Sequence, residues 1–216
     1  MIKYVFSYSL ILINGMLLAQ SNTKLTKEET VEYINKRSKE VVGYTKANSA
    51  GEVFTIKDQF CKLTSDNKIE RSLERVRIGY DFNPNYGQLD RRVVNIEIYN
   101  PAHIQSIELG ASTNEAEAVG TIVINLLPQS ARHTFQIYNR FPDINKYIGP
   151  SGPDDLRAYA WNWVPLDKNK GGSGNEQASA VYLYFLKTDP SNFNRLKRAL
   201  EHLRDLCKAE KDPFGD

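Results

Sequence analysis

Hydrophobic residues at helical spacing predict a helix near the beginning of the chain, over residues 27–42. Val31, Ile34 and Val41 recur at intervals that place them on one side of a helix, and charged residues occupy the other side. Thr26 and Glu29 have the spacing of a capping box, in which each side chain accepts a hydrogen bond from the other residue's backbone N–H. The helix is therefore expected to begin directly after Thr26 and to bury one face.

A second amphipathic helix is predicted over residues 192–208, after the turn residues Asp189, Pro190 and Ser191. Its apolar stripe consists of Phe193, Leu196, Leu200, Leu203 and Cys207. The opposite side is charged. In a chain rich in strands, such a helix is expected to pack on a sheet rather than to lie on a membrane surface.

Between the two helices the pattern changes to a period of two, which is typical of half-buried strands. Alternation covers residues 75–82, 94–98, 122–126 and 133–137, and weaker candidates are 52–63, 104–109 and 156–163. Val94, Ile96 and Ile98 are expected on the buried face of their strand. Residues 180–186 are apolar on both faces, which predicts a central, covered strand. Residues 167–177 contain no apolar residue and include the run GGSG (171–174), which predicts a mobile loop.

About eight strands follow one another without an intervening helix, which favours an antiparallel arrangement over a parallel sheet. The expected fold is α+β and mostly antiparallel β. We expect a bent sandwich or barrel with an N-terminal helix and a C-terminal amphipathic helix packed on the sheet. A single domain is expected over residues 20–216, closed by the helix at about 192–208.

The first nineteen residues have the pattern of a signal peptide. Lys3 supplies a positive charge, residues 5–18 are mostly apolar, and Ala19 is a small residue at which a signal peptidase would cut. The apolar run is shorter than the roughly 20 residues that a transmembrane helix needs. No cysteine follows that could carry a lipid anchor. We therefore expect export to the periplasm or the exterior without a stable transmembrane anchor; a buried N-terminal helix is the alternative.

The two cysteines leave two alternatives open. Cys61 lies in a predicted strand and Cys207 near the end of the last predicted helix. In an exported protein they could form a disulfide that ties this helix to the sheet, and the spacing alone does not show whether they meet. The other alternative is two buried free thiols, since cysteine packs as a small hydrophobic residue.

Composition and charge argue against two classes of protein. With 41% hydrophobic residues, 25% charged residues and a formal net charge of +2, the chain is neither disordered nor built to bind nucleic acid. Five arginines could form a basic patch, but carboxylates interleave with them. The arginines are Arg71, Arg75, Arg77, Arg91 and Arg92, and the carboxylates are Glu70, Glu74, Asp81 and Asp90. A solvated strand face is the favoured interpretation.

No catalytic residue, metal site or cofactor is predicted. None of the three histidines, His103, His133 and His202, has another metal-binding residue at the spacing of a known metal motif. No G-x-S-x-G motif occurs either. A hydrolase with a scattered site is a third alternative. It would require a histidine in a cleft beside a carboxylate or a thiol.

The strongest candidate for a binding site is aromatic. Tyr159, Trp161 and Trp163 would lie on one face of a strand, where their rings could stack on sugars or bases or anchor a protein partner. The simpler interpretation is that these rings cover the core.

The layout, strands over about 52–187 followed by the helix at 192–208, resembles the pleckstrin-homology-like fold. The segments TKEETVEYI (26–34) and HLRDLC (202–207) also resemble small exported bacterial proteins of unknown function. The resemblance implies a docking platform and places no catalytic or lipid-binding residue. The expected function is a non-catalytic binding or interaction domain of the bacterial periplasm or exterior, with an envelope protein as partner. The alternative is a β-barrel that binds a lipid or glycan through its aromatic face.

Overall fold

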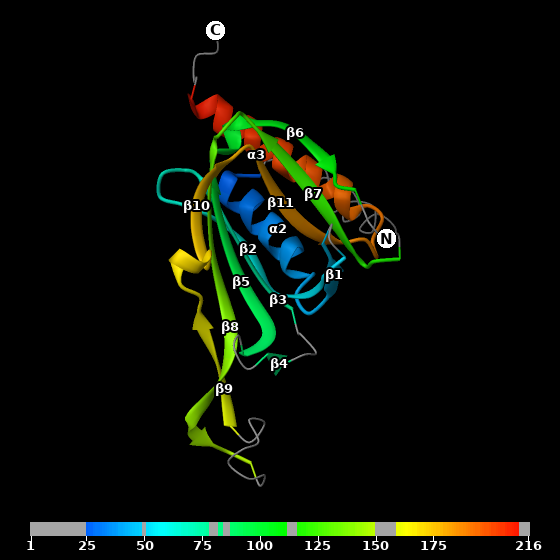
Figure 1. Ribbon diagram of the computed structural model, residues 1–216. Coiled ribbons are helices and arrows are strands. Elements are labelled where there is room, and N and C mark those ends of the chain that lie inside the picture. Colours follow the sequence, from blue (N-terminus) through cyan, green and yellow to red (C-terminus); the bar gives the residue numbers. More distant parts are fainter. Residues whose placement is uncertain are drawn as a thin grey trace, which may run out of the picture.

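In the described part of the chain, two antiparallel sheets and two α-helices form an α+β fold in the computed structural model (Figure 1). The structure describes residues 25–48, 51–77, 82–83, 87–111, 116–149 and 159–211, so the predicted signal peptide lies outside the described residues. The large sheet has the order β1-β2-β3-β5-β8-β10, with β4 paired to β5 and β9 to β8, and the small sheet has the order β11-β7-β6. The predicted class is confirmed. The barrel is not, because both sheets end in open edges.

The described α-helices are α2 (Lys27–Lys39) and α3 (Asn192–Lys211), and the described 3-10 helices are η1 (Pro101–His103) and η3 (Lys168–Lys170). The strands are β1 (Thr45–Ala47), β2 (Val53–Leu63), β3 (Ile69–Arg77), β4 (Phe82–Asn83), β5 (Gly87–Tyr99), β6 (Ile104–Leu109), β7 (Val119–Leu126), β8 (Ala131–Tyr147), β9 (Tyr159–Pro165), β10 (Ser173–Ala178) and β11 (Ala180–Leu186).

Helix α2 begins with the predicted capping box. The Thr26 hydroxyl accepts from the Glu29 backbone N–H at 3.2 Å, and the Glu29 carboxylate accepts from the Thr26 N–H at 2.8 Å. The helix ends at Lys39, three residues earlier than predicted. The following turn contains Gly43 at a φ of +90°, a conformation that glycine adopts without steric cost. Val42 is therefore exposed in this turn.

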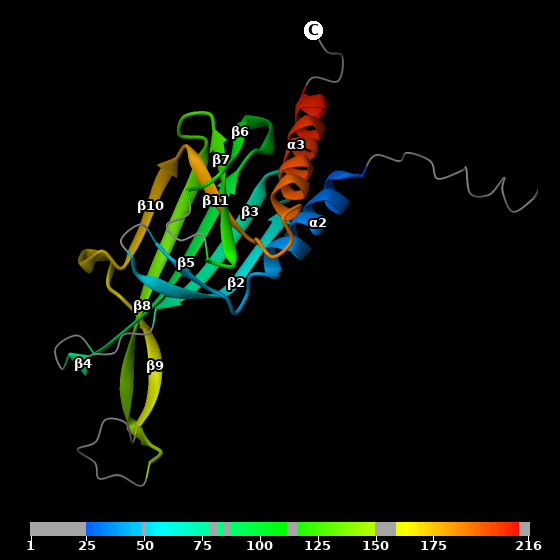
Figure 2. The same cartoon turned by 90° about the vertical axis from the view of Figure 1, so that its right-hand side faces the viewer.

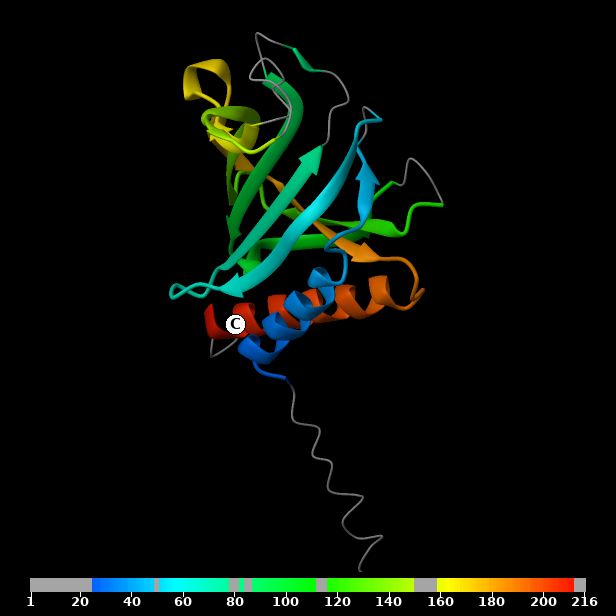
Figure 3. The ribbon, with the colours of Figure 1, turned by 90° about the horizontal axis from the view of Figure 1, so that it is seen from below.

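Helix α3 packs beside α2 along one side of the sheets (Figure 3). The predicted stripe is confirmed, since Leu196, Leu200, Leu203 and Cys207 are buried in one core cluster with Val31 and Ile34 of α2 and with residues of both sheets. No described helix is long and apolar enough to cross a membrane.

The face of strand β5 that points to the interior is not the face that its apolar residues predict. Asn95, Glu97 and Tyr99 are buried, whereas Ile96 and Ile98 are only half-buried on the outer face. The polar residues can lie inside because they bind other inward-facing groups. The Glu97 carboxylate pairs with Arg71 Nη1 at 2.5 Å, and Asn95 faces His133. Mutual bonding removes the cost of burying them.

Strand β11 is neither central nor covered on both faces, since Tyr182 is exposed. It forms an edge of the small sheet, and the Gln59 side chain of the large sheet binds the Tyr184 backbone there. The side-chain amide thus satisfies backbone groups that a neighbouring strand would otherwise bind.

The predicted mobile loop at 167–177 is mostly regular structure. It contains η3 and β10, and β10 pairs with β8 along its whole length. Gly171, at a φ of +72°, and Gly172 make the turn between them. A Cβ on Gly172 would lie 2.0 Å from the Leu166 carbonyl oxygen, so these glycines serve a tight turn rather than a flexible linker.

Candidate binding pocket

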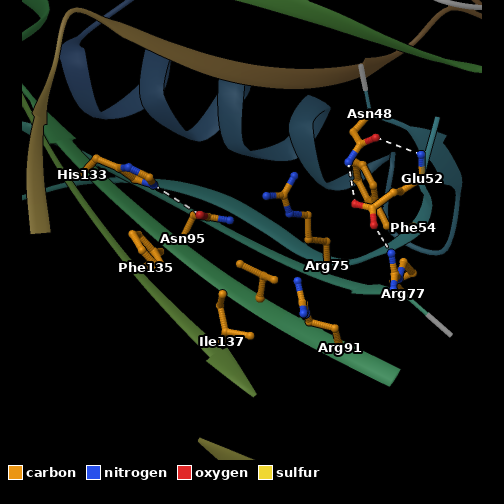
Figure 4. A pocket seen from close by; sticks show the side chains of 11 residues that line it. Asn48, Glu52, Phe54, Arg75, Arg77, Arg91, Asn95, His133, Phe135 and Ile137 are labelled. Atoms are coloured by element: carbon orange, nitrogen blue, oxygen red, sulfur yellow. Dashed lines mark hydrogen bonds and ion pairs between the residues drawn. The ribbon is translucent and has the colours of Figure 1, made fainter. Parts of the chain in front are cut away.

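A pocket of about 300 Å³ opens on the inner side of the large sheet, where β3, β5 and β8 lie side by side (Figure 4). We call it the inner pocket. The residues that line it are Asn48, Glu52, Phe54, Arg75, Arg77, Arg91, Val93, Asn95, His133, Phe135 and Ile137. A groove of about 620 Å³ adjoins it between the large sheet and β11. The two cavities share Arg75, Asn95 and His133, so they adjoin each other along these residues.

Alternation along β3 and β5 brings the arginines into this pocket. Arg75 and Arg77 point inward from β3, and Arg91 joins them because the register places it opposite Arg77. Glu70 and Glu74 occupy positions of the other parity and therefore the outer face.

The sequence interpretation of a solvated strand face does not hold for Arg71, which is buried, or for Arg75, which is half-buried in the pocket. Arg91 is exposed, as that interpretation expects. The sequence contained a signal of this arrangement. The arginines of β3 stand at odd positions and its glutamates at even positions, so the two kinds of side chain lie on opposite faces of the strand. Arg92 is the exception, since it lies on the outer face and pairs with Glu74 at 2.9 Å.

Two of the inward arginines are paired, and two are not. Arg71 is buried against Glu97, and Arg77 pairs with Glu52. Within the described part of the chain, no carboxylate pairs with Arg75 or Arg91. The pocket therefore carries an excess of positive charge although the whole chain is nearly neutral.

We call the apolar part of the lining the floor of the inner pocket. It is formed by Phe54, Val93, Phe135 and Ile137. The guanidinium carbon of Arg75 lies 5.2 Å from the centre of the Phe54 ring, so the cation is held over an aromatic face. The ring of Phe135 lies across Gly174 of β10, where a Cβ would approach it to 2.4 Å. The absence of a side chain at Gly174 therefore leaves room for this ring.

His133 occupies the boundary between the two cavities, and both of its ring nitrogens face oxygen atoms. Nδ1 lies 2.9 Å from Glu176 Oε1, and Nε2 lies 3.2 Å from Asn95 Oδ1. The carboxylate comes from β10, forty-three residues along the chain, so local spacing could not reveal it. His133 thus meets the condition stated above for a hydrolase, a histidine in a cleft beside a carboxylate. None of the residues that the structure describes offers His133 a hydroxyl or thiol bond.

Tyr184 of β11 lines the adjoining groove. Burial raises the pKa of Tyr184, and the charges of Arg71 and Arg75 act in the opposite direction. Its hydroxyl therefore stays a neutral hydrogen-bonding group at physiological pH.

The predicted aromatic face lies away from the inner pocket. β9 forms as predicted and pairs with the far part of β8 in an arm that extends from the body (Figure 2). The register sets Trp163 opposite Arg140 and Trp161 opposite Pro142, so the two indoles share a face, and the guanidinium carbon of Arg140 lies 5.8 Å from the centre of the Trp161 ring. Both are half-buried. The side chain of Tyr159 is outside the description, and glycan or lipid binding by this face stays a prediction.

Cys61 and Cys207 lie in the same core cluster as free, buried thiols. Burial raises the pKa of Cys61 to about 12 and raises the pKa of Cys207 as well. His202 binds the Leu25 carbonyl on the surface. No three metal-ligating side chains of the described residues are placed to hold a metal ion.

Comparison of the chain with protein-family models, with curated proteins and with solved structures finds no match.

Proposed function

We propose that this protein is an exported binding domain of the bacterial periplasm or exterior that holds a small molecule in the inner pocket and does not catalyse a reaction. The carrying observation is the pocket itself, in which an apolar floor is combined with arginine, asparagine and histidine side chains that converge on it. Small-molecule sites have this composition: mostly apolar walls with a few placed polar groups.

The pocket favours a small ligand over the envelope protein that the sequence analysis put first. A protein partner would need an exposed surface whose apolar centre becomes buried in the complex. These polar groups instead converge inside a hollow between two sheets. The pleckstrin-homology-like resemblance stays a prediction and does not carry this proposal, because function depends on the site rather than on the fold.

Hydrolysis is a second candidate because His133 and Glu176 form a histidine–carboxylate pair in the cavity. Such a pair orients the ring for proton transfer. Binding is preferred because the second ring nitrogen is engaged by Asn95, so it is not directed at a substrate or a nucleophile. Replacing His133 by Gln should leave ligand binding within a few-fold of wild type. Loss of a measured esterase or phosphatase activity in this variant would instead support the hydrolase.

The first test is native mass spectrometry of the chain purified untagged from the cells that produce it. We expect a one-to-one complex with a small molecule that is released on denaturation. Replacing Val93 by Trp should abolish retention, because this residue lies between Arg75 and Ile137 in the register and an indole there would fill the inner pocket.

Val94→Trp is the matched control, since the neighbouring side chain lies on the outer face of the same strand. It should keep the ligand. A chain that is bare in the wild type, or that keeps its ligand in Val93→Trp with the native circular dichroism spectrum, would contradict the proposal. A stable protein complex recovered by crosslinking would then restore the docking interpretation.

A further inference from the structure

We infer that the ligand of the inner pocket is an amphiphilic anion: a carboxylate or phosphate group that lies against Arg75 and Arg91, joined to an apolar chain or ring that covers the floor. This inference rests on the proposed function and names the class of ligand for the same site. It follows from three features of the cavity. They are the positive charges that no carboxylate pairs with, the apolar floor, and the planar shape of the guanidinium groups.

The charge comes first. Every described carboxylate that lines the two cavities is already engaged by a cation or histidine: Glu52 by Arg77, Glu97 by Arg71 and Glu176 by His133. Arg75 and Arg91 keep their positive charges without an acidic partner among the described residues. Charges of one sign in a cleft with low-dielectric walls attract a ligand of the opposite sign.

The surroundings of the two arginines differ, and this orders their importance. Arg75 is half-buried and lies over the Phe54 ring, whereas Arg91 is exposed. A charge held partly away from water interacts more strongly with an anion than a fully hydrated one does. Arg75 should therefore contribute most of the anion affinity, and Arg91 should add a smaller share.

The floor sets the rest of the ligand. Phe54, Val93, Phe135 and Ile137 offer apolar surface directly beside the guanidinium groups. An inorganic anion would leave this surface in contact with water, and a neutral hydrocarbon would leave the arginines without a partner. Only a molecule with both parts uses the whole pocket. Because the planar guanidinium matches the two oxygens of a carboxylate or phosphate, both head groups fit.

The test is calorimetric titration of the chain purified from the producing cells and freed of bound molecules, with five probes. Octanoate and octyl phosphate carry both parts, octanol lacks the charge, and acetate and inorganic phosphate lack the chain. We expect both amphiphilic anions to bind at least about tenfold more tightly than octanol or the small ions, as the loss of charge-assisted hydrogen bonds predicts. The ratio of octanoate to octyl phosphate affinity then distinguishes the two head groups.

Three variants assign the effect to the pocket. Arg75→Gln should remove the preference for octanoate over octanol, a loss of about tenfold or more, and Arg91→Gln should weaken octanoate a few-fold. Arg75→Lys keeps the charge and should retain part of the preference, which separates lost attraction from a disturbed fold. Arg132→Gln is the matched control: it removes one positive charge from the exposed outer face of β8 and should change nothing.

Nuclear magnetic resonance of the Val93 and Ile137 methyl groups locates the bound probe. Octanol that shifts these signals and binds as tightly as octanoate would overturn the ligand class and leave the small-molecule function standing. An unchanged octanoate preference in Arg75→Gln and Arg91→Gln would overturn it as well. If no probe shifts these methyl groups, the ligand class is wrong, and the retained molecule detected by mass spectrometry decides the proposed function separately.

Discussion

At the scale of single residues, Gln59 joins the two sheets. It is fully buried, and its amide makes four hydrogen bonds. Nε2 donates to the carbonyls of Ser38 and Tyr184, both at 2.9 Å. Oε1 accepts from the Tyr184 N–H at 3.0 Å and from Arg71 Nη2 at 3.3 Å. One side chain therefore fixes the edge of β11, the end of α2 and the buried ion pair of β3.

Replacing Gln59 by Leu should lower the free energy of unfolding by about 3 kcal/mol, because several buried polar groups would lose their partners. Urea unfolding followed by circular dichroism measures this change. Gln105→Leu, at an exposed position of β6, is the control and should stay within about 0.5 kcal/mol of wild type. A loss below about 1 kcal/mol in Gln59→Leu would show that water or a shifted neighbour replaces the amide.

At the scale of secondary-structure elements, the turn before β10 depends on glycine. Gly171 has a left-handed conformation, and Gly172 has no room for a side chain beside Leu166. The turn places β10 against β8, and β10 carries the Glu176 that binds His133. The shape of one connection therefore determines whether the wall of the cavity forms.

Gly172→Ala should destabilise the chain by about 3 kcal/mol, since the new Cβ must displace the Leu166 backbone. Ser173→Ala, the next position, should have a small effect and serves as the control. Thermal unfolding gives the stability of both variants, and amide hydrogen exchange of β10 shows whether the loss is local. Equal exchange rates in β10 of the two variants would contradict this account of the turn.

The strands also show how far periodicity reaches at this scale. Helical spacing located α2 and α3. Alternation located most strands of the described ranges, but β1 was not predicted and β10 lies in the segment that was predicted as a loop. Alternation did not determine which face of β5 points inward, because Ile96 and Ile98 are apolar while Asn95 and Glu97 are buried by mutual bonding. A strand with a polar inner face needs bonding partners from other strands, and those partners are not visible in its own sequence.

At the scale of the whole molecule, Cys61 and Cys207 come from the large sheet and from α3 and meet the same core cluster. The structure has both as free thiols. Because burial raises the pKa of Cys61 to about 12, the folded chain keeps this thiol protonated, and only the thiolate reacts readily. Whether the two cysteines are free or bonded therefore shows whether α3 is held to the sheet by packing alone or also by a covalent bond.

We expect no rapid reaction of the native protein with a thiol reagent at pH 8, and two reactive thiols after unfolding without reductant. Cys207→Ser should leave one. The raised pKa also predicts that stability falls as the pH rises above the ordinary thiol value towards 12, since the unfolded chain then loses its proton first. Thiols that appear only after reduction would show instead that Cys61 and Cys207 form a disulfide.

The sequence alone determined the elements that depend on near neighbours. The capping box of Thr26 and Glu29, the stripe of α3 and the alternation of the strands are set by contacts within a few residues, so their patterns are legible in the chain. The sequence also places the β3 arginines at odd positions. This predicts that they share one face of the strand, but not whether that face points to the interior or to solvent.

Only the tertiary structure decided where the candidate site lies. The inner pocket needs Arg75 of β3, Arg91 of β5 and His133 of β8 on one inward face, and Glu176 from a strand that the sequence suggested was a loop. These residues meet through strand pairing over long separations, and their charges remain or cancel according to which partners the fold supplies. Pairing and charge compensation are properties of the folded molecule, and local patterns do not encode them.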